Sequence, residues 1–158
     1  MPEEPRNVTI HAAAVVVAEA GVLIRGVSGA GKSSLALAVV DAAAARGLFA
    51  RLVADDRVLL TPRHGRLIAR PHPAIAGRVE RRGQGIALIG HESAAVLRCV
   101  VDFAAAIGTS GAPDRMAAAE AQCATLAGVE LPRLVVPTGL GAAETARILL
   151  DFLVRRAA

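Results

Sequence analysis

An eight-residue segment near the N-terminus has the spacing of a phosphate-binding loop. Gly26, Gly31, Lys32 and Ser33 match the pattern of a glycine, any four residues, a glycine, a lysine and a serine or threonine. We expect Lys32 to contact the β- and γ-phosphates of a nucleotide and the Ser33 hydroxyl to bind Mg²⁺. The residues expected to bind the nucleotide are Gly26, Val27, Ser28, Gly29, Ala30, Gly31, Lys32 and Ser33.

Glycine and lysine are the residue types that such a loop needs. Glycines allow successive backbone N–H groups to turn toward phosphate oxygens, and the N-terminus of a following helix adds a favourable partial charge. Lys32 is the only lysine among 18 basic residues, and a compact ammonium group suits a tight phosphate site better than a guanidinium. The alternative is a glycine-rich turn that only caps a helix. The complete pattern between an apolar strand and a helix favours phosphate binding.

Two adjacent carboxylates, Asp55 and Asp56, follow a short apolar strand expected over residues 49–54. Ligands of α/β proteins bind at the carboxyl ends of strands, beside such a loop. One carboxylate there can support a metal ion, and the other can accept the proton of an attacking hydroxyl group. The alternative is a solvated turn in which Arg57 is the counter-ion. The phosphate-binding motif one helix upstream favours the catalytic interpretation.

A third polar segment, residues 79–86, places an acid, basic residues and two glycines between apolar stretches. Glu80 could bind Mg²⁺, and Arg82 could stabilise negative charge on a transferred phosphoryl group. From spacing alone, a solvated turn with internal salt bridges is the better explanation of this segment.

The pattern of apolar residues and turn residues predicts the elements that position these motifs. Many short strands with few helices favour an α/β fold with a mixed sheet, an incomplete α/β sandwich rather than a doubly wound sheet. No repeat or linker divides the chain, so we expect one domain over residues 1–158. Strands are expected over 7–18, 21–25, 49–54, 58–61, 66–70, 96–103 and 129–137, with helices over 33–46, ended by Gly47, and over 142–156.

Composition argues against several classes of protein. The longest wholly apolar run near the N-terminus, residues 12–18, is too short to span a bilayer, and the acidic start does not resemble a signal peptide. Cys99 and Cys123 match neither a metal spacing nor a disulfide framework, which indicates reduced thiols in a cytoplasmic protein. The net charge is +4, but arginines are scattered along the chain and only 2% of residues are aromatic, so nucleic-acid binding is not expected.

Taken in order, the motifs resemble those of the catalytic domain of bacterial HPr kinase/phosphorylase, a P-loop enzyme that modifies a serine of the phosphocarrier HPr. The match covers most of the chain and includes a histidine before the loop, the loop itself, a strand with an aspartate pair, a Glu-x-Arg-Gly-x-Gly-Ile element, and a later Asp-Arg-Leu segment followed by Ile-Pro. The matching residues are His11, Gly26–Ser33, Leu52–Asp56, Glu80–Ile86, Asp114-Arg115-Met116 and Leu131-Pro132.

The resemblance implies a role for each matching residue. Ser33 and Glu80 would bind Mg²⁺, Lys32 would hold phosphate and Asp56 would be the base. Asp55 would support the metal ion, Arg82 would stabilise the moving charge, and His11 and Arg115 would be active-site residues. The implied activity is ATP-dependent phosphorylation of HPr, which regulates the phosphotransferase system of carbohydrate uptake. By the same resemblance the enzyme would act in the cytoplasm as a homo-oligomer, for which the family suggests a hexamer.

Differences from the longer members of the family narrow this expectation. The chain resembles the short form found in α-proteobacteria, which lacks a separate N-terminal domain. Where longer enzymes have an arginine-containing loop linked to dephosphorylation, residues 137–141 contain no arginine, so the reverse phosphorylase reaction is not expected. Ser34 occupies a position that is usually acidic in the family.

Two other functions use the same loop. A small-molecule kinase would need a lid, for which residues 104–113 are the candidate. A nucleotide-binding regulator without transfer activity would not need the aspartate pair or Glu80. A GTPase is excluded, because the guanine-binding Asn-Lys-x-Asp motif requires a second lysine.

Overall fold

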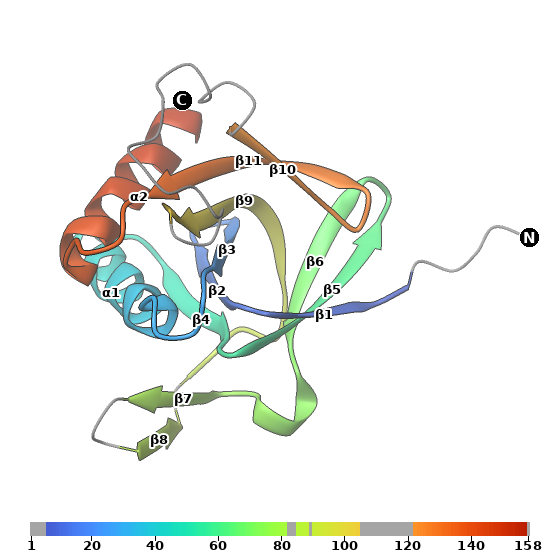
Figure 1. Cartoon of the computed structure of the whole chain (residues 1–158), viewed down its shortest axis with the longest axis horizontal. Helices are drawn as coiled ribbons and strands as arrows, with labels where there is room; N and C mark the ends of the chain where they lie inside the picture. The colour runs from blue at the N-terminus through green and yellow to red at the C-terminus, as the bar shows by residue number, and fades with distance from the viewer. Residues whose placement is uncertain (1–5, 82–84, 89, 105–121, 158) are drawn as a thin grey trace, which may run out of the picture.

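The computed structural model describes residues 6–81, 85–88, 90–104 and 122–157. Nine strands form one mixed sheet in the order β1-β5-β6-β9-β3-β2-β4, with β11 also pairing with β9 and β10 with β11 (Figure 1). The strands of this sheet are β1 (Val8–His11), β2 (Ala13–Val17), β3 (Ala20–Arg25), β4 (Ala50–Ala54), β5 (Arg57–Arg63), β6 (Arg66–Pro71), β9 (Ala95–Phe103), β10 (Cys123–Leu126) and β11 (Val129–Val136).

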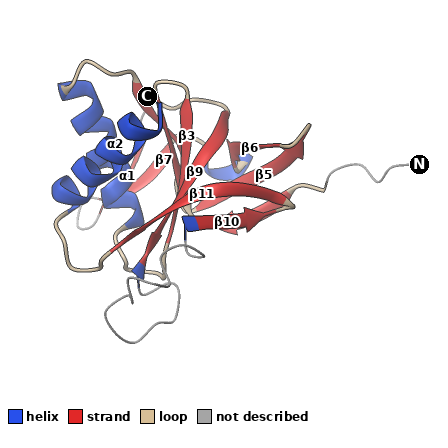
Figure 2. Ribbon diagram, turned by 90° about the horizontal axis from the view of Figure 1, so that it is seen from above, coloured by secondary structure: helices blue, strands red, loops and turns tan. Residues whose placement is uncertain are grey.

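The helices cover one side of the sheet, as Figure 2 shows. They are α1 (Lys32–Ala45) and α2 (Ala142–Ala157), which pack against each other. A 3₁₀ turn, η1 (Pro73–Ile75), leads into a separate hairpin of β7 (Arg78–Arg81) and β8 (Gly85–Leu88). The mixed sheet with two helices confirms the predicted incomplete α/β architecture, and no described helix has the length and hydropathy to cross a membrane.

The sheet curls so that it encloses two apolar cores. Strand β9 pairs antiparallel with β6 at its beginning and parallel with β3 and β11 further along. One core, which includes Leu35, Val39 and Leu149, lies between the helices and the central strands. The second core, which includes Leu60 and Leu67, lies between the central strands and the antiparallel layer β1-β5-β6. The central strands are therefore buried on both faces.

The prediction of one strand over residues 7–18 is wrong, because the chain changes partner within it. Strand β1 pairs with β5, whereas β2 pairs with β3 and β4. Between β1 and β2, the Ala12 N–H donates to the Asp56 carbonyl at 3.1 Å, which ties the crossing point to the end of β4. A run of β-branched residues indicates strand but not which strand it will pair with.

The other predicted strands and both helices are present, with ends that differ by a few residues. The prediction that Gly47 ends the first helix is confirmed: Gly47 has φ of +73° and follows the last turn. The Leu48 N–H donates to the Ala43 carbonyl at 2.9 Å, and the Gly47 N–H to Ala44 at 3.0 Å. These two bonds make a Schellman motif, which satisfies carbonyls at the helix end.

Gly21 allows strands β3 and β9 to approach each other closely. A Cβ atom at this position would lie 2.6 Å from the Val96 carbonyl oxygen. The pairing of β3 with β9 shifts register between Gly21 and Val22. A side chain here would force the two strands apart, so the glycine fixes the strand that leads into the phosphate-binding motif.

Both cysteines are free thiols in the structure. Cys99 is buried in the core beneath the helices, and burial raises the pKa of its thiol to about 12. Cys123 is exposed on β10, and a hydrogen bond to Glu130 raises the pKa of its thiol. Neither thiol lies against the phosphate-binding loop or the aspartate pair, and both are weakly acidic.

Candidate active site

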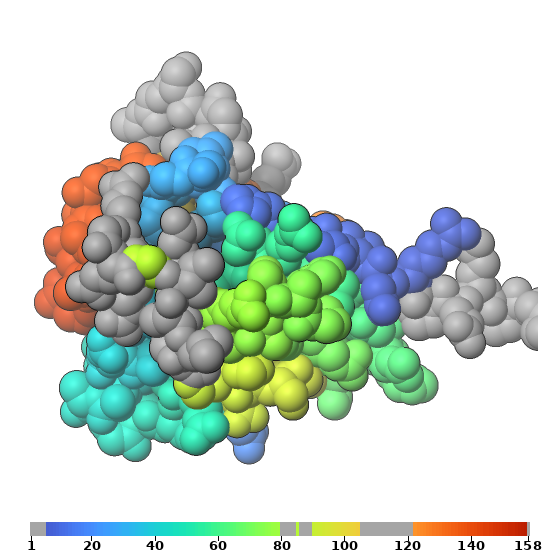
Figure 3. All heavy atoms as spheres, turned by 90° about the horizontal axis from the view of Figure 1, so that it is seen from below, coloured from blue at the N-terminus to red at the C-terminus, as the bar shows by residue number. Residues whose placement is uncertain are grey.

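Three polar segments meet at one edge of the sheet because of the direction of three neighbouring strands. Strand β2 is antiparallel to both β3 and β4. The carboxyl ends of β3 and β4 and the amino end of β2 therefore lie at the same edge, which places Gly26, Asp55 and His11 together. Figure 3 shows this face, where the loop after β3 (light blue), the end of β1 (blue) and the start of β5 (green) approach one another.

The loop between β3 and α1 has the backbone form that its glycines allow. Gly29 has φ of +83° and Gly31 has φ of +101°, values that most side chains disfavour. A Cβ atom at either position would meet nothing within 4 Å, so it would project into open space at the mouth of the loop. At Gly26, in contrast, a Cβ atom would lie 2.9 Å from the Phe103 ring. The loop is thus open on its ligand side and packed on the other.

Lys32 begins α1 and reaches back over the loop. Its side chain is buried, and Nζ donates to the carbonyls of Gly26 at 2.8 Å and of Val27 at 3.1 Å. Two neutral carbonyls satisfy hydrogen bonds but do not neutralise the charge. A buried ammonium group held this way is suited to an anionic ligand.

The next residue connects the loop with the aspartate pair. The Ser33 hydroxyl donates to Asp55 Oδ1 at 2.6 Å, and Asp55 is buried at the end of β4. These two residues are 22 positions apart, so their contact depends on β4 lying beside α1. A hydroxyl oxygen and a carboxylate oxygen at this distance are the donor set that Mg²⁺ prefers.

Asp56 differs from Asp55 in exposure and in backbone conformation. Its Oδ1 lies 2.5 Å from His11 Nε2, and both side chains are more than half exposed. Asp56 has φ of +70°, which costs a non-glycine residue about 1–3 kcal/mol. The Ala12 N–H bond to its carbonyl and the Arg57 N–H bond to the Asp55 carbonyl hold this turn. The strained turn directs adjacent carboxylates to different surroundings, one buried and one exposed.

A pocket of about 520 Å³ joins these groups. Most of its lining was expected from the sequence: Ser28, Gly29, Gly31, Lys32, Ser33, Asp55, Asp56 and His11. Ser34 also lines it. Ile75 and Arg78, from η1 and the start of β7, are pocket residues that the motifs did not indicate. In the sequence, Arg78 was marked only by its position near the basic segment around Glu80. That position does not indicate which arginine of the region lines the pocket.

Several predicted site residues lie outside the described residues. Arg82 and Arg115 do so, as do the Asp114-Arg115 motif and nearly all of the candidate lid over 104–113. Glu80 is in β7, opposite Ile86 of β8, but its side chain is not among those described. The roles expected for these residues stay predictions.

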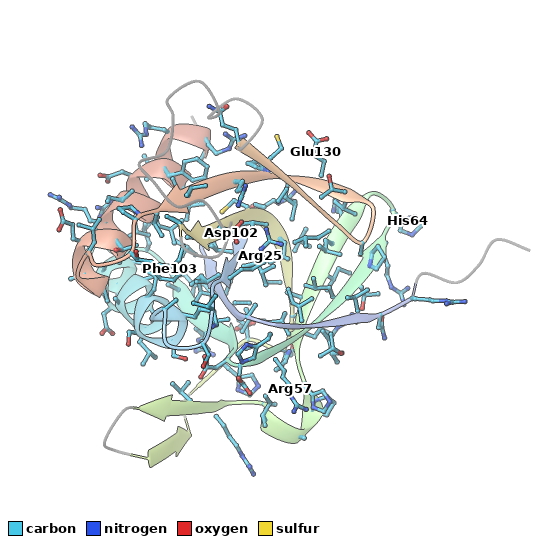
Figure 4. The ribbon with its side chains drawn as sticks, viewed as in Figure 1. Arg25, Arg57, His64, Asp102, Phe103 and Glu130 are labelled. Carbon is cyan, nitrogen blue, oxygen red and sulfur yellow. The ribbon has the colours of Figure 1, made fainter. Side chains whose placement is uncertain are left out.

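A second group of charges lies beneath the loop. Arg25, at the end of β3, donates two hydrogen bonds to Asp102 at 2.8 and 2.7 Å, and Arg133 donates a third at 2.5 Å. Asp102 is only 2% exposed. Figure 4 shows Arg25 and Asp102 side by side at the centre of the molecule. This group ties β3, β9 and β11 together directly below Gly26.

Comparison with known proteins agrees with this geometry. The HPr kinase/phosphorylase of Mycoplasma mycoides is 42% identical over 76 residues, which are 48% of this chain and 22% of that protein. The aligned segment thus spans about a fifth of the relative's length. The structure of the HPr(Ser) kinase/phosphatase from Coxiella burnetii superposes with a TM-score of 0.74 at 21% identity, covering 96% of this chain and 99% of that one. Residues 5–155 match the model of the HPr serine kinase C-terminal domain, and the chain belongs to this family.

Proposed function

We propose that this protein is an ATP-dependent protein-serine kinase that phosphorylates the phosphocarrier HPr. The observation that carries the proposal is the convergence of Asp55 and Asp56 on the pocket that the loop lines with Ser28, Gly29, Gly31, Lys32 and Ser33. Family membership and the names of the two similar proteins support HPr as the acceptor. A nucleotide-binding regulator would have no need of a carboxylate at the mouth of the pocket.

The residues of the pocket fit the phosphates of ATP. Gly29 and Gly31 leave open the space that side chains would fill, and the start of α1 contributes a favourable partial charge. Lys32 is held where its ammonium group can bind a terminal phosphate once it leaves the two loop carbonyls. The loop therefore binds and orients the phosphoryl donor.

Ser33 and Asp55 fit a magnesium ion. Their oxygens are already together, and Glu80 is proposed as a further ligand. Among the described residues, no three His, Cys, Asp or Glu side chains gather as a metal site, so the ion would depend on the nucleotide for its remaining ligands. When bound, Mg²⁺ would neutralise charge on the phosphates.

Asp56 is proposed as the base. Its exposed carboxylate can take the proton of an entering serine hydroxyl as the serine oxygen attacks the γ-phosphorus and the bond to ADP breaks. His11 would orient the carboxylate through the 2.5 Å contact. Arg82 and Arg115 are proposed to stabilise the transferred charge, and Arg78, which lines the pocket, can do the same.

The remaining features of the proposal follow the family. Residues 1–158 would form one catalytic domain that acts in the cytoplasm as a homo-oligomer. The forward kinase reaction is proposed as the main one, because residues 137–141, between β11 and α2, contain no arginine.

The direct test is incubation of the protein with ATP, Mg²⁺ and HPr, followed by mapping of any phosphoserine by mass spectrometry. Phosphate on one HPr serine, absent with Lys32→Ala, supports the proposal. ATP hydrolysis with no phosphate on HPr would instead indicate a small-molecule kinase or an ATPase. Tight nucleotide binding without turnover would indicate a regulator.

A further inference from the structure

The outer face of the hairpin formed by strands β5 and β6 carries four arginines. Residues alternate across a strand, so Arg57 and Arg63 of β5 lie on one face, as do Arg66 and Arg70 of β6. Arg63 is directly opposite Arg66, and Leu59 is directly opposite Arg70, so the four arginines share one side. We call the side formed by these four arginines the basic face.

The orientation of the basic face is determined by the core. Val58, Leu60, Leu67 and Ala69, which alternate with the arginines, are fully buried between the antiparallel layer and the central strands. The arginines therefore point outward, and all four are exposed. The helices cover the opposite side of the molecule, as Figure 2 shows. Within this side Thr61 is buried and its hydroxyl donates to Asn7, whereas the four arginines remain exposed.

The charges on the basic face are not neutralised within the described part of the chain. Strands β1, β5 and β6 contain no Asp or Glu. None of the four arginine side chains makes a hydrogen bond or an ion pair with another described residue. Like charges directly opposite each other, such as Arg63 and Arg66, destabilise a sheet. Folding does not need this arrangement, whereas binding of an acidic partner would use it.

The basic face begins at the pocket. Arg57 follows Asp56, and His11, the partner of Asp56, is directly opposite Arg57. In Figure 4, Arg57 marks the pocket end of β5 and His64 the far end of the hairpin. A protein that places one of its serines beside Asp56 also brings the surface around that serine against neighbouring elements of this chain. Strands β5 and β6 are among the nearest of these elements.

We propose that the basic face docks an acidic surface of the protein that supplies the serine hydroxyl. This inference rests on the proposed kinase function. The apolar side chains of Leu59 and Ile68 lie between the arginines, as in a protein interface with a polar rim. These two strands carry no aromatic side chain on which a nucleic-acid base could stack, which favours a protein partner.

The test compares charge reversals on the basic face with a matched reversal elsewhere. Arg66→Glu and Arg70→Glu lie away from the pocket lining, so they should leave the ATP affinity and kcat unchanged. Arg147→Glu, at an exposed position of helix α2, makes the same change in net charge on the other side. The expected result is a KM for HPr about tenfold higher for each face variant and unchanged for Arg147→Glu, with a difference that shrinks as salt rises.

Two measurements distinguish a failure of the docking proposal from a failure of the kinase proposal. One is the KM for HPr, and the other is calorimetry of HPr binding in the presence of a non-hydrolysable ATP analogue. If the wild type transfers phosphate but all three variants have its KM, the docking surface is wrong and the kinase stands. If the wild type transfers nothing, the kinase proposal fails. In that case calorimetry still tests the docking surface. If Arg70→Glu and the wild type bind HPr with equal affinity, the docking surface is wrong as well.

Two further outcomes would assign the basic face to another partner. If the face variants lose affinity for duplex RNA or DNA but not for HPr, the occupant is a nucleic acid. If they change the mass of the protein in solution by light scattering, the face is an interface between copies of this chain. Either result contradicts the proposal.

Discussion

Two aspartates near the same edge of the sheet are in opposite environments. Asp102, in β9, is buried and accepts three hydrogen bonds from Arg25 and Arg133. Asp56, after β4, is 59% exposed in a strained turn beside a histidine. Strands β9 and β4 are part of one sheet, and the two aspartates are 46 positions apart in the chain.

The difference indicates which carboxylate is available for chemistry. Two guanidinium groups already neutralise Asp102, and burial excludes a substrate from it. Asp56 lines the pocket and can accept a proton there. The local backbone also differs, since Asp56 has φ of +70°, a left-handed conformation that costs stability in a non-glycine residue. Asp102 thus holds the strands in place, whereas Asp56 is the carboxylate that we propose meets the substrate.

The largest effect on stability is expected for Asp102→Asn. Removing this charge leaves Arg133, whose side chain is only 12% exposed, without a counter-ion, which should lower the free energy of unfolding by about 3–5 kcal/mol. Urea denaturation measures the loss. At a temperature where the variant is folded, transfer to HPr should stay within about threefold of the wild type, because Asp102 does not line the pocket. A folded variant without activity would break the comparison by giving Asp102 a role in catalysis.

Lys32→Ala should lower transfer by about a hundredfold to a thousandfold, because a preorganised cation at the phosphates is removed. Affinity for ATP should fall as well, and equilibrium dialysis would detect it. Stability should change little, since the lost contacts are two hydrogen bonds to loop carbonyls. Unchanged ATP affinity would mean that residues 26–33 do not hold the nucleotide.

The smallest effect is expected for His11→Ala. The contact with Asp56 is exposed to solvent, so stability should change by less than about 1 kcal/mol. Transfer should fall by about tenfold, because Asp56 loses the group that orients it. His11→Asn, which can still donate a hydrogen bond, should recover part of the rate. Full activity in His11→Ala would show that Asp56 needs no partner.

Local patterns in the sequence indicated the parts of the site that depend on neighbouring residues. The loop over 26–33 and the Gly47 helix end follow from glycine positions, and both are present. The proximity of Ser33 and Asp55 was expected, because both were predicted to serve the same metal ion, but their direct hydrogen bond was not predicted. The fold class could be predicted because the sequence pattern indicates many short strands and few helices.

Features that depend on which strands pair could not be predicted from the sequence. The change of partner at Ala12, which divides residues 7–18 into two strands, leaves no mark on the apolar pattern. Arg25 and Asp102 are 77 positions apart and meet only through the pairing of β3 with β9. The arginines of β5 and β6 appeared scattered, and their common face depends on the register of the hairpin. The buried face of each strand fixes its register in the fold, but the apolar pattern of one sequence does not reveal which strands become neighbours.

The role of Asp56 is tested most directly by Asp56→Asn, assayed with ATP, Mg²⁺ and HPr under single-turnover conditions. The substitution keeps the size of the side chain and removes the base. The account predicts that ATP affinity is retained while the rate of phosphoserine formation falls by about a hundredfold or more. Transfer at the wild-type rate would contradict the account, because the reacting hydroxyl would then need no carboxylate at this position.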